Sequence, residues 1–267
     1  NLNGSPFDDV VTVIPLPGLT SSRVINGSAA TSVAGDSLTV DFGNAPATHT
    51  LTGIGFGTLQ KDGSFGTVSY LDVETVNRMN VTTLGVGVAP EVDLGSIAFS
   101  LAQMTVEVRT GANDLLGSFD VSAINSVTYT GLDSVDDHLI LDESAGLLLP
   151  AGCVSYSGGA GGNDSLTLLG NGTRSVTYTP DATVPGNGVI DAGGRMITFT
   201  GLEPVSIEGQ AVGNLTLHGT DDVLSIANGV TNSSVAGLLV SGTSAGVAIE
   251  PVVFQNNGAV TIDTTQN

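Results

Sequence analysis

Five short segments of this chain repeat one pattern, in which acidic or amide residues precede a run of alternating aliphatic residues. The segments are Asp8–Val13, Asp36–Val40, Asp136–Leu141, Asn163–Leu168 and Asp221–Ile226. Asp9 and Asp36 are 27 residues apart, and so are Asp137 and Asp164. An Asp or Asn side chain caps a turn by accepting backbone N–H groups, after which a short strand begins. The pattern therefore predicts a succession of turns and short strands.

A second repeated motif contains an aromatic residue, an aliphatic residue three positions later, an acid and a valine. Three copies align without gaps, at Tyr70–Val76, Tyr129–Val135 and Phe199–Val205. A shorter fourth copy, Ile249–Val252, shares the Glu-Pro-Val of Glu203–Val205. Internal repeats indicate an architecture in which each unit stacks on the next. The irregular spacing of the copies favours a stack that accommodates insertions as loops.

These repeats predict an all-β fold, specifically a parallel β-helix or β-solenoid of short strands. Aromatic residues make up only 4% of the chain and tryptophan is absent, which predicts a narrow interior of aliphatic rows. Tandem antiparallel β-sandwiches are the alternative, because regularly spaced short strands would suit them equally well. We expect a single elongated domain over residues 1–267, with a possible subdivision near 110–125.

The chain is strongly acidic, with 26 Asp and Glu against 6 Lys and Arg and a formal net charge of −20. Such a surface repels phosphate groups, which excludes nucleic acid and anionic membrane surfaces as expected partners. No stretch approaches the roughly 20 apolar residues of a membrane span, so no membrane insertion is expected. The chain starts at Asn1 without a leader, which suggests a processed mature form or an excised region.

No combination of residues predicts a catalytic site, and we expect a protein that is not an enzyme. His49, His138 and His218 lack metal-binding spacing and are expected to be isolated surface or strand residues. Cys153 has no partner for a disulfide and is expected to be a buried, inert thiol. A polysaccharide-acting enzyme is the least favoured alternative, because the basic residues that an acidic sugar requires are few and scattered.

Calcium is the one cofactor that the sequence suggests, since Ca²⁺ binds the oxygen atoms of Asp and Asn side chains in turns. The candidate ligands are the paired turn residues Asp8, Asp9, Asp136, Asp137, Asn163, Asp164, Asp221 and Asp222. The competing interpretation is that these residues cap turns and remain solvated.

Two stretches resemble known families. Phe199–Ile207 followed by Gly219–Ile226 resembles the degenerate repeats of large bacterial surface and secreted proteins, of planctomycete-type and adhesin-like kinds. Gly158–Leu166 resembles the glycine–aspartate repeat of calcium-binding toxins, although it has an extra glycine and no tandem copy. The resemblance implies a parallel β-helix and an extracellular role without a defined chemistry.

The expected function is therefore structural: a stiff extracellular stalk, fibre or filament subunit on the cell surface. Its expected partners are further copies stacked head to tail, or neighbouring repeats of a longer chain, because the ends of a solenoid expose unpaired strand edges. The alternative is an adhesin module that binds glycans. A cluster of exposed Tyr, Asn and Asp on one face would favour that alternative.

Overall fold

The described residues form 25 β-strands and no helix. The computed structural model describes residues 1–5, 7–14, 21–28, 35–42, 47–53, 55–61, 66–73, 75–78, 81–87, 96–100, 105–109, 115–120, 124–131, 133–134, 136–146, 149–231 and 234–264. Within these ranges there is consequently no helix long and apolar enough to cross a membrane. The predicted all-β fold class is confirmed.

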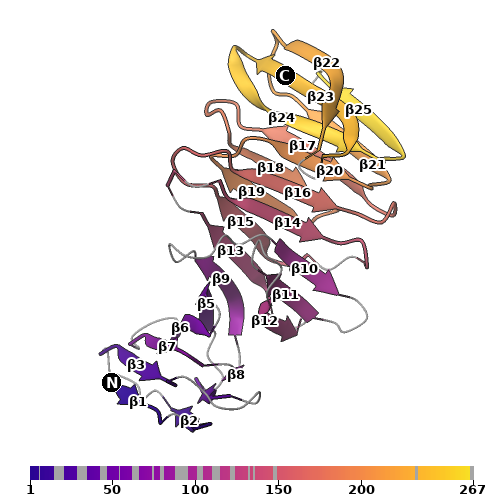
Figure 1. Cartoon of the computed structure of the whole chain (residues 1–267). Coiled ribbons are helices and arrows are strands. Elements are labelled where there is room, and N and C mark those ends of the chain that lie inside the picture. Colours follow the sequence, from indigo (N-terminus) through magenta and orange to yellow (C-terminus); the bar gives the residue numbers. More distant parts are fainter. Residues whose placement is uncertain are drawn as a thin grey trace.

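The strands alternate between two sides of an elongated molecule whose termini lie at opposite ends (Figure 1). The first twelve are β1 (Leu2–Asn3), β2 (Val10–Val13), β3 (Arg23–Asn26), β4 (Ser37–Val40), β5 (Ala47–Gly53), β6 (Phe56–Lys61), β7 (Val68–Leu71), β8 (Thr75–Arg78), β9 (Val81–Gly87), β10 (Ser96–Ser100), β11 (Thr105–Arg109) and β12 (Leu115–Asp120). The others are β13 (Ser126–Thr130), β14 (His138–Asp142), β15 (Cys153–Ser157), β16 (Ser165–Leu169), β17 (Ser175–Pro180), β18 (Gly188–Asp191), β19 (Met196–Thr200), β20 (Val205–Glu208), β21 (Val212–Thr216), β22 (Val223–Val230), β23 (Ala236–Ser244), β24 (Val247–Gln255) and β25 (Ala259–Asp263).

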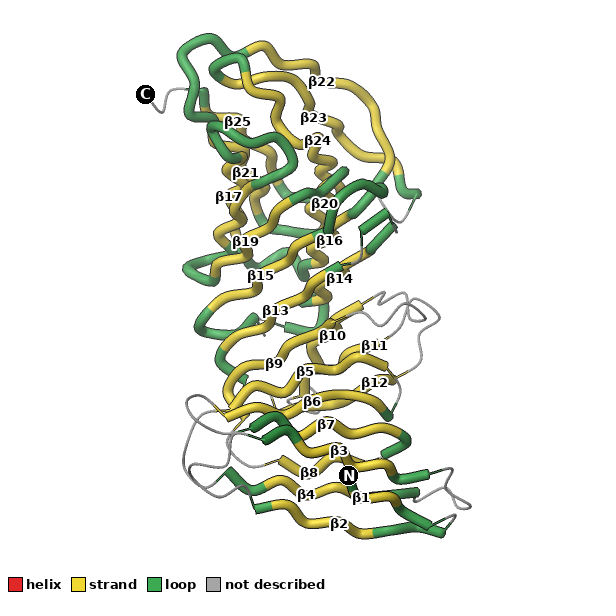
Figure 2. Tube along the Cα trace, turned by 90° about the vertical axis from the view of Figure 1, so that its left-hand side faces the viewer, coloured by secondary structure: helices red, strands yellow, loops and turns green. Residues whose placement is uncertain are grey.

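Three sheets result, two of them mixed and the smallest one parallel, with their strands stacked along the length of the molecule (Figure 2). The large sheet has the order β1-β3-β7-β6-β5-β9-β13-β15-β19-β18-β17-β21-β25. The second sheet has the order β12-β11-β10-β14-β16-β20-β24-β23-β22, and the small sheet has the order β2-β4-β8. Parallel pairs such as β13–β15 and β14–β16 alternate with antiparallel pairs such as β5–β6 and β22–β23. The arrangement is therefore neither purely parallel nor purely antiparallel.

The strand order of β1–β12 occurs again in β13–β24, and we call these the first unit and the second unit. Each unit contains two antiparallel meanders of three strands, β5–β7 and β10–β12 in the first and β17–β19 and β22–β24 in the second. In the meander β5–β7, the last strand pairs in parallel with β3 and the first with β9. In β17–β19, the last strand likewise pairs with β15 and the first with β21. The chain thus repeats a structural unit of twelve strands.

Turns at equivalent places in the two units use glycine for the same reason. Gly55 and Gly186 have φ of 75° and 77°, a left-handed conformation that glycine adopts without steric cost. The carbonyl oxygen of Gly55 accepts the backbone N–H of Val73 at 3.1 Å, and that of Gly186 accepts the N–H of Leu202 at 2.9 Å. Each glycine therefore ties the turn of a meander to the segment that leaves it.

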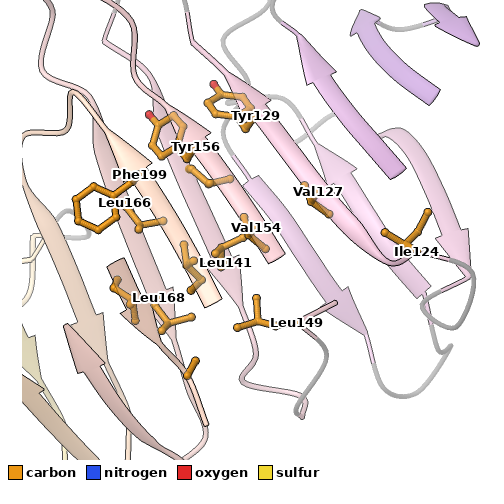
Figure 3. Close-up of a cluster of buried hydrophobic side chains, with 14 of the residues drawn as sticks. Ile124, Val127, Tyr129, Leu141, Leu149, Val154, Tyr156, Leu166, Leu168 and Phe199 are labelled. Atoms are coloured by element: carbon orange, nitrogen blue, oxygen red, sulfur yellow. The ribbon is translucent and has the colours of Figure 1, made fainter. Parts of the chain in front are cut away.

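The interior contains buried aromatic rings as well as the predicted aliphatic rows. The largest fully buried side chains include Tyr129, Tyr156, Tyr178 and Phe199. Tyr129, Tyr156 and Phe199 lie in register on three adjacent parallel strands, with the ring centroids of the two tyrosines 4.8 Å apart (Figure 3). A parallel ladder places identical positions one above another, so that one wide position can hold a row of rings.

Both sequence motifs correspond to real strand registers. Val205 pairs with Val252, which places the two Glu-Pro-Val segments side by side. Val10 pairs with Ser37 and His138 with Ser165, so each 27-residue interval spans one turn of the stack. The large sheet runs without a break from β1 to β25. Much of the segment 110–125 lies outside the described residues, and the single domain with its possible subdivision stays a prediction.

Candidate functional site: an acidic column and its cleft

The predicted ligand pairs divide into an outer and an inner residue. The first residue of each pair is exposed: Asp8, Asp136, Asn163 and Asp221. Of the second residues, Asp137 and Asp164 are buried, and Asp9 and Asp222 are partly buried. Consecutive residues of an extended segment point to opposite faces, which explains the division. The expectation that all these residues remain solvated is wrong for the two buried carboxylates.

The inner carboxylates cap the backbone of the neighbouring turn. Asp36 Oδ1 accepts the backbone N–H of Asp9 at 2.7 Å, and Asp164 Oδ1 accepts that of Asp137 at 2.9 Å. Asp137 Oδ1 also accepts the hydroxyl of Tyr129 at 3.0 Å. These contacts agree with the capping interpretation, because each carboxylate satisfies donors that the strand ladder leaves unpaired.

A glycine makes room for the inner carboxylate in both units. A Cβ atom added to Gly27 would lie 2.4 Å from Asp36 Oδ2, and one added to Gly131 would lie 2.5 Å from Asp137 Oδ2. At Gly158 the added atom would lie 2.5 Å from the Asp164 Cβ. Gly131 and Gly158 each follow a tyrosine of the interior row by two residues. This Tyr-x-Gly spacing is a signal that the sequence motifs alone did not bring out.

Four acids lie at equivalent register positions in the second sheet, and we call them the acidic column: Asp137, Asp164 and Glu203, which precede β14, β16 and β20, and Glu250, which lies within β24. Glu203 and Glu250 were not among the predicted site residues. Their signal in the sequence was the Glu-Pro-Val that the two segments share. Local sequence could not reveal that β16, β20 and β24 bring these acids together.

A cleft of about 670 Å³ opens along the column. Its acidic lining consists of Asp164, Glu203 and Glu250. The remainder is mainly glycine and proline: Gly159, Gly161, Gly162, Pro185, Gly186, Gly201, Pro204, Gly242 and Pro251, with Asn163, Ser241, Ala248 and Ile249. No Lys, Arg or His is among the described residues that line it. The cleft is therefore a pocket of negative charge without a basic partner.

Burial changes the titration of the column. Burial, and to a lesser extent the negative charge of Glu203, raise the pKa of Glu250 to about 8. Burial is also the main reason why the pKa of Asp164 rises to about 6, against the opposing effect of the Asp137 backbone N–H. The charges of Asp137, Asp136 and Glu203 add to the shift at Asp164. Perturbed carboxyl groups in a cleft are typical of a binding or catalytic site.

Glu250 has the most unusual environment in the cleft. The residue is only 5% exposed, and its Oε1 atom has no hydrogen-bond partner among the described residues. The Tyr178 hydroxyl donates a hydrogen bond of 3.5 Å to the backbone carbonyl oxygen of Glu250, and not to its carboxyl group. Buried polar atoms are paired in the great majority of cases, so an orphaned carboxyl oxygen that lines a cleft needs an explanation.

The described part of the chain contains no group of three or more His, Cys, Asp or Glu side chains that could hold a metal ion. The four predicted pairs lie on separate turns, and calcium binding by them stays a hypothesis. His49 lies in strand β5, which agrees with the prediction of a surface or strand residue, but it is fully buried and its Nε2 lies 2.8 Å from the Tyr70 hydroxyl. Cys153 is half-buried instead of buried.

Comparison of the chain with protein-family models, with curated proteins and with solved structures gives no match. The resemblance to bacterial surface repeats thus remains a hypothesis. Any function must be argued from the strand arrangement and from the acidic column.

Proposed function

We propose that the chain is a structural protein, a β-solenoid rod that serves as an extracellular stalk or filament subunit on the cell surface. The observation that carries this proposal is the way in which the two units join. The second unit continues the first through two parallel backbone pairings, β9 with β13 and β10 with β14. A unit that joins its own copy through strand edges is suited to building a long stack.

The contacts inside the stack support a mechanical role. Neighbouring turns share backbone hydrogen bonds and rows of interior side chains, and two of them also share a carboxylate cap. The cap from Asp164 to the Asp137 N–H, for example, has its counterpart in the cap from Asp36 to the Asp9 N–H. Contacts repeated at every step resist bending along the whole length. The net charge of −20 keeps such a rod soluble and prevents side-by-side association.

Apolar side chains are exposed on the outermost strands and in the segments next to them at both ends of the stack. At the β1–β2 end they are Leu2, Phe7, Val10 and Ile14, and at the β22 end they are Val223, Ile226, Val230 and Val235. Val10 is 80% exposed and Val223 is 69% exposed. Apolar residues beside unpaired strand edges favour pairing with another copy. We therefore propose head-to-tail stacking of copies as the mode of assembly.

The positions of the tyrosines favour a scaffold over a glycan-binding adhesin. The chain has four tyrosines, Tyr70, Tyr129, Tyr156 and Tyr178, and all four are buried. Tryptophan is absent. The cluster of exposed tyrosines that would favour glycan recognition is therefore missing.

Electron microscopy of the purified chain at several concentrations tests the proposal. We expect rods that lengthen into uniform filaments as concentration rises. The variant Ile226→Lys, which places a charge on the β22 edge, should abolish filaments and leave single rods. Val184→Lys is the matched control, because Val184 is 47% exposed but lies in the β17–β18 connection. Compact particles without elongation would overturn the rod, and filaments that survive Ile226→Lys would overturn the stacking mode.

A further inference from the structure

The cleft along the acidic column has no role in the proposed rod, and its lining indicates a ligand. We infer that it binds a divalent cation, Ca²⁺, through the carboxyl groups of Glu203 and Glu250. These two residues occupy equivalent register positions, each two residues before the paired valines Val205 and Val252 of the parallel strands β20 and β24. Parallel strands lie roughly 4.8 Å apart, so two carboxyl groups in register are near enough to share one ion.

An unsatisfied group inside the cleft supplies the independent evidence. Glu250 is 95% removed from solvent, lines the cleft, and keeps its Oε1 atom without a hydrogen-bond partner. A buried carboxyl group with neither donor nor counter-ion is destabilising unless a ligand compensates it. A cation bound between Glu250 and Glu203 would provide that compensation.

Asp164 has a different role from the two glutamates. Its Oδ1 already accepts the Asp137 N–H at 2.9 Å, so it contributes mainly negative charge to the cleft. Two carboxyl groups, with the charge of Asp164 behind them, form a site that remains incomplete without other ligands. This agrees with the lack of any cluster of three metal-binding side chains in the described ranges.

The chemistry of the lining selects a hard cation. Carboxylate and backbone carbonyl oxygens are Ca²⁺ ligands, and no His or Cys is among the described lining residues to favour zinc. Ca²⁺ tolerates irregular shells of six to eight oxygens that include water, whereas Mg²⁺ demands near-ideal octahedral geometry. The cleft of about 670 Å³ leaves ample room for such water ligands. An anionic ligand would be repelled by the three acids.

Calorimetric titration of the full chain with CaCl₂ tests the inference. We expect a dissociation constant of about 0.1–1 mM, the range of weak extracellular calcium sites. At pH 9, above the pKa of about 8 of Glu250, Glu250→Gln and Glu203→Gln should each weaken binding about tenfold or more, since each removes a carboxylate ligand. Asp142→Asn is the matched control, because Asp142 ends β14, away from the cleft, and the Asn side chain can still accept the Ser144 N–H. It should bind calcium as the unchanged chain does.

Three outcomes would overturn the site. The first is no binding at about 10 mM CaCl₂, a concentration tenfold above the weak end of that range. The second is equal calcium binding by the unchanged chain and both glutamine variants. The third is tighter binding of Mg²⁺ than of Ca²⁺. Circular dichroism confirms that the variants are folded. If a lysine-rich peptide binds and calcium does not, the cleft recognises a basic partner and the inference is wrong. Calcium binding and filament formation are separate measurements, so the failure of one leaves the other standing.

Discussion

The first and second units share one strand order but fill it with different side chains. At equivalent places in their meanders, His49 contacts Tyr70 in the first unit and Tyr178 contacts Phe199 in the second. The ring centroids lie 5.7 Å apart in one pair and 5.8 Å apart in the other. His49 and Tyr70 form a buried hydrogen bond, whereas the second pair is held by apolar ring packing. The geometry is retained although the chemistry has changed.

The residues that both units share are those that the conformation and hydrogen bonding of the backbone require. The carboxylate caps Asp36 and Asp164 recur, and so do the left-handed glycines Gly55 and Gly186. Interior rings vary more, because any side chain of suitable volume can fill the same position. The comparison teaches that this stack tolerates changes in its interior more readily than changes at its turns.

The units also differ in continuity. In the second unit, β20 pairs with β24 and the second sheet continues through the meander. In the first unit, the described residues show no pairing between β8 and β12, so the small sheet and the second sheet are separate. We expect the second unit to be the more stable, and the following predictions test this difference.

The largest effect is expected from removing a ring of the interior row. Tyr156→Ala should lower the free energy of unfolding by about 3–5 kcal/mol, because a fully buried ring leaves a cavity. The change also removes the hydrogen bond from the Tyr156 hydroxyl to the Asp137 carbonyl oxygen. Ile25→Ala, at the equivalent place in the first unit, should cost only about 2–3 kcal/mol. Urea unfolding of both variants gives the comparison, and a larger cost for Ile25→Ala would contradict it.

A smaller loss is expected from adding a methyl group opposite a ring. Gly188 pairs with Phe199 across the meander, and an added Cβ would lie 2.7 Å from the Phe199 ring. Gly188→Ala should therefore cost about 1–3 kcal/mol through overpacking. In a double-mutant cycle followed by urea unfolding, Phe199→Leu should recover part of that loss. Strict additivity of the two changes would show that the glycine is needed for another reason.

Substitutions of the capping carboxylates separate the stabilising effect of the hydrogen bond from that of the negative charge. Asp164→Ala should cost about 1–2 kcal/mol, because the Asp137 N–H loses its acceptor in a buried place. Asp164→Asn keeps an acceptor and should cost much less at pH 8. The same pair of substitutions at Asp36 tests the first unit. Thermal melting gives the order of stability of the variants. Equal losses of stability for the Ala and Asn variants would mean that the charge, and not the hydrogen bond, stabilises the turn.

A pH dependence is expected from the carboxyl groups with raised pKa in the second unit. The pKa of Glu250 is raised in the folded chain to about 8, so folding binds a proton between the ordinary pKa of glutamate and that value. Stability that is present at low pH is therefore lost as pH rises through about 8. Asp164, with a pKa of about 6, contributes a loss of the same sign at lower pH. Melting temperatures from pH 5 to 9 should decline, and Glu250→Gln should flatten the upper part of the decline; an unchanged slope would contradict the assignment.

Local sequence predicted the parts of the fold that depend on neighbouring residues. The acid before each aliphatic run correctly indicated a turn followed by a strand, as at Asp137 and Asp164. The 27-residue interval between the acids equals the distance between paired positions on adjacent strands. The aligned Glu-Pro-Val segments also proved to be neighbours in register. These features persist because caps and strand propensities act within a few residues.

The meanders and the cleft were decided by tertiary structure. Nothing in residues 175–200 indicates that β19, the last strand of the meander, returns to pair with β15. Glu203 and Glu250 are 47 residues apart, and only the pairing of β20 with β24 brings them into one cleft. Strand pairing over such distances depends on which edges remain open after the rest of the stack has formed, and an edge has no signature in the local sequence. The sequence by itself determined the turns, the strands and their β class; the order of the strands, the aromatic row and the environment of the acids arose only from long-range packing.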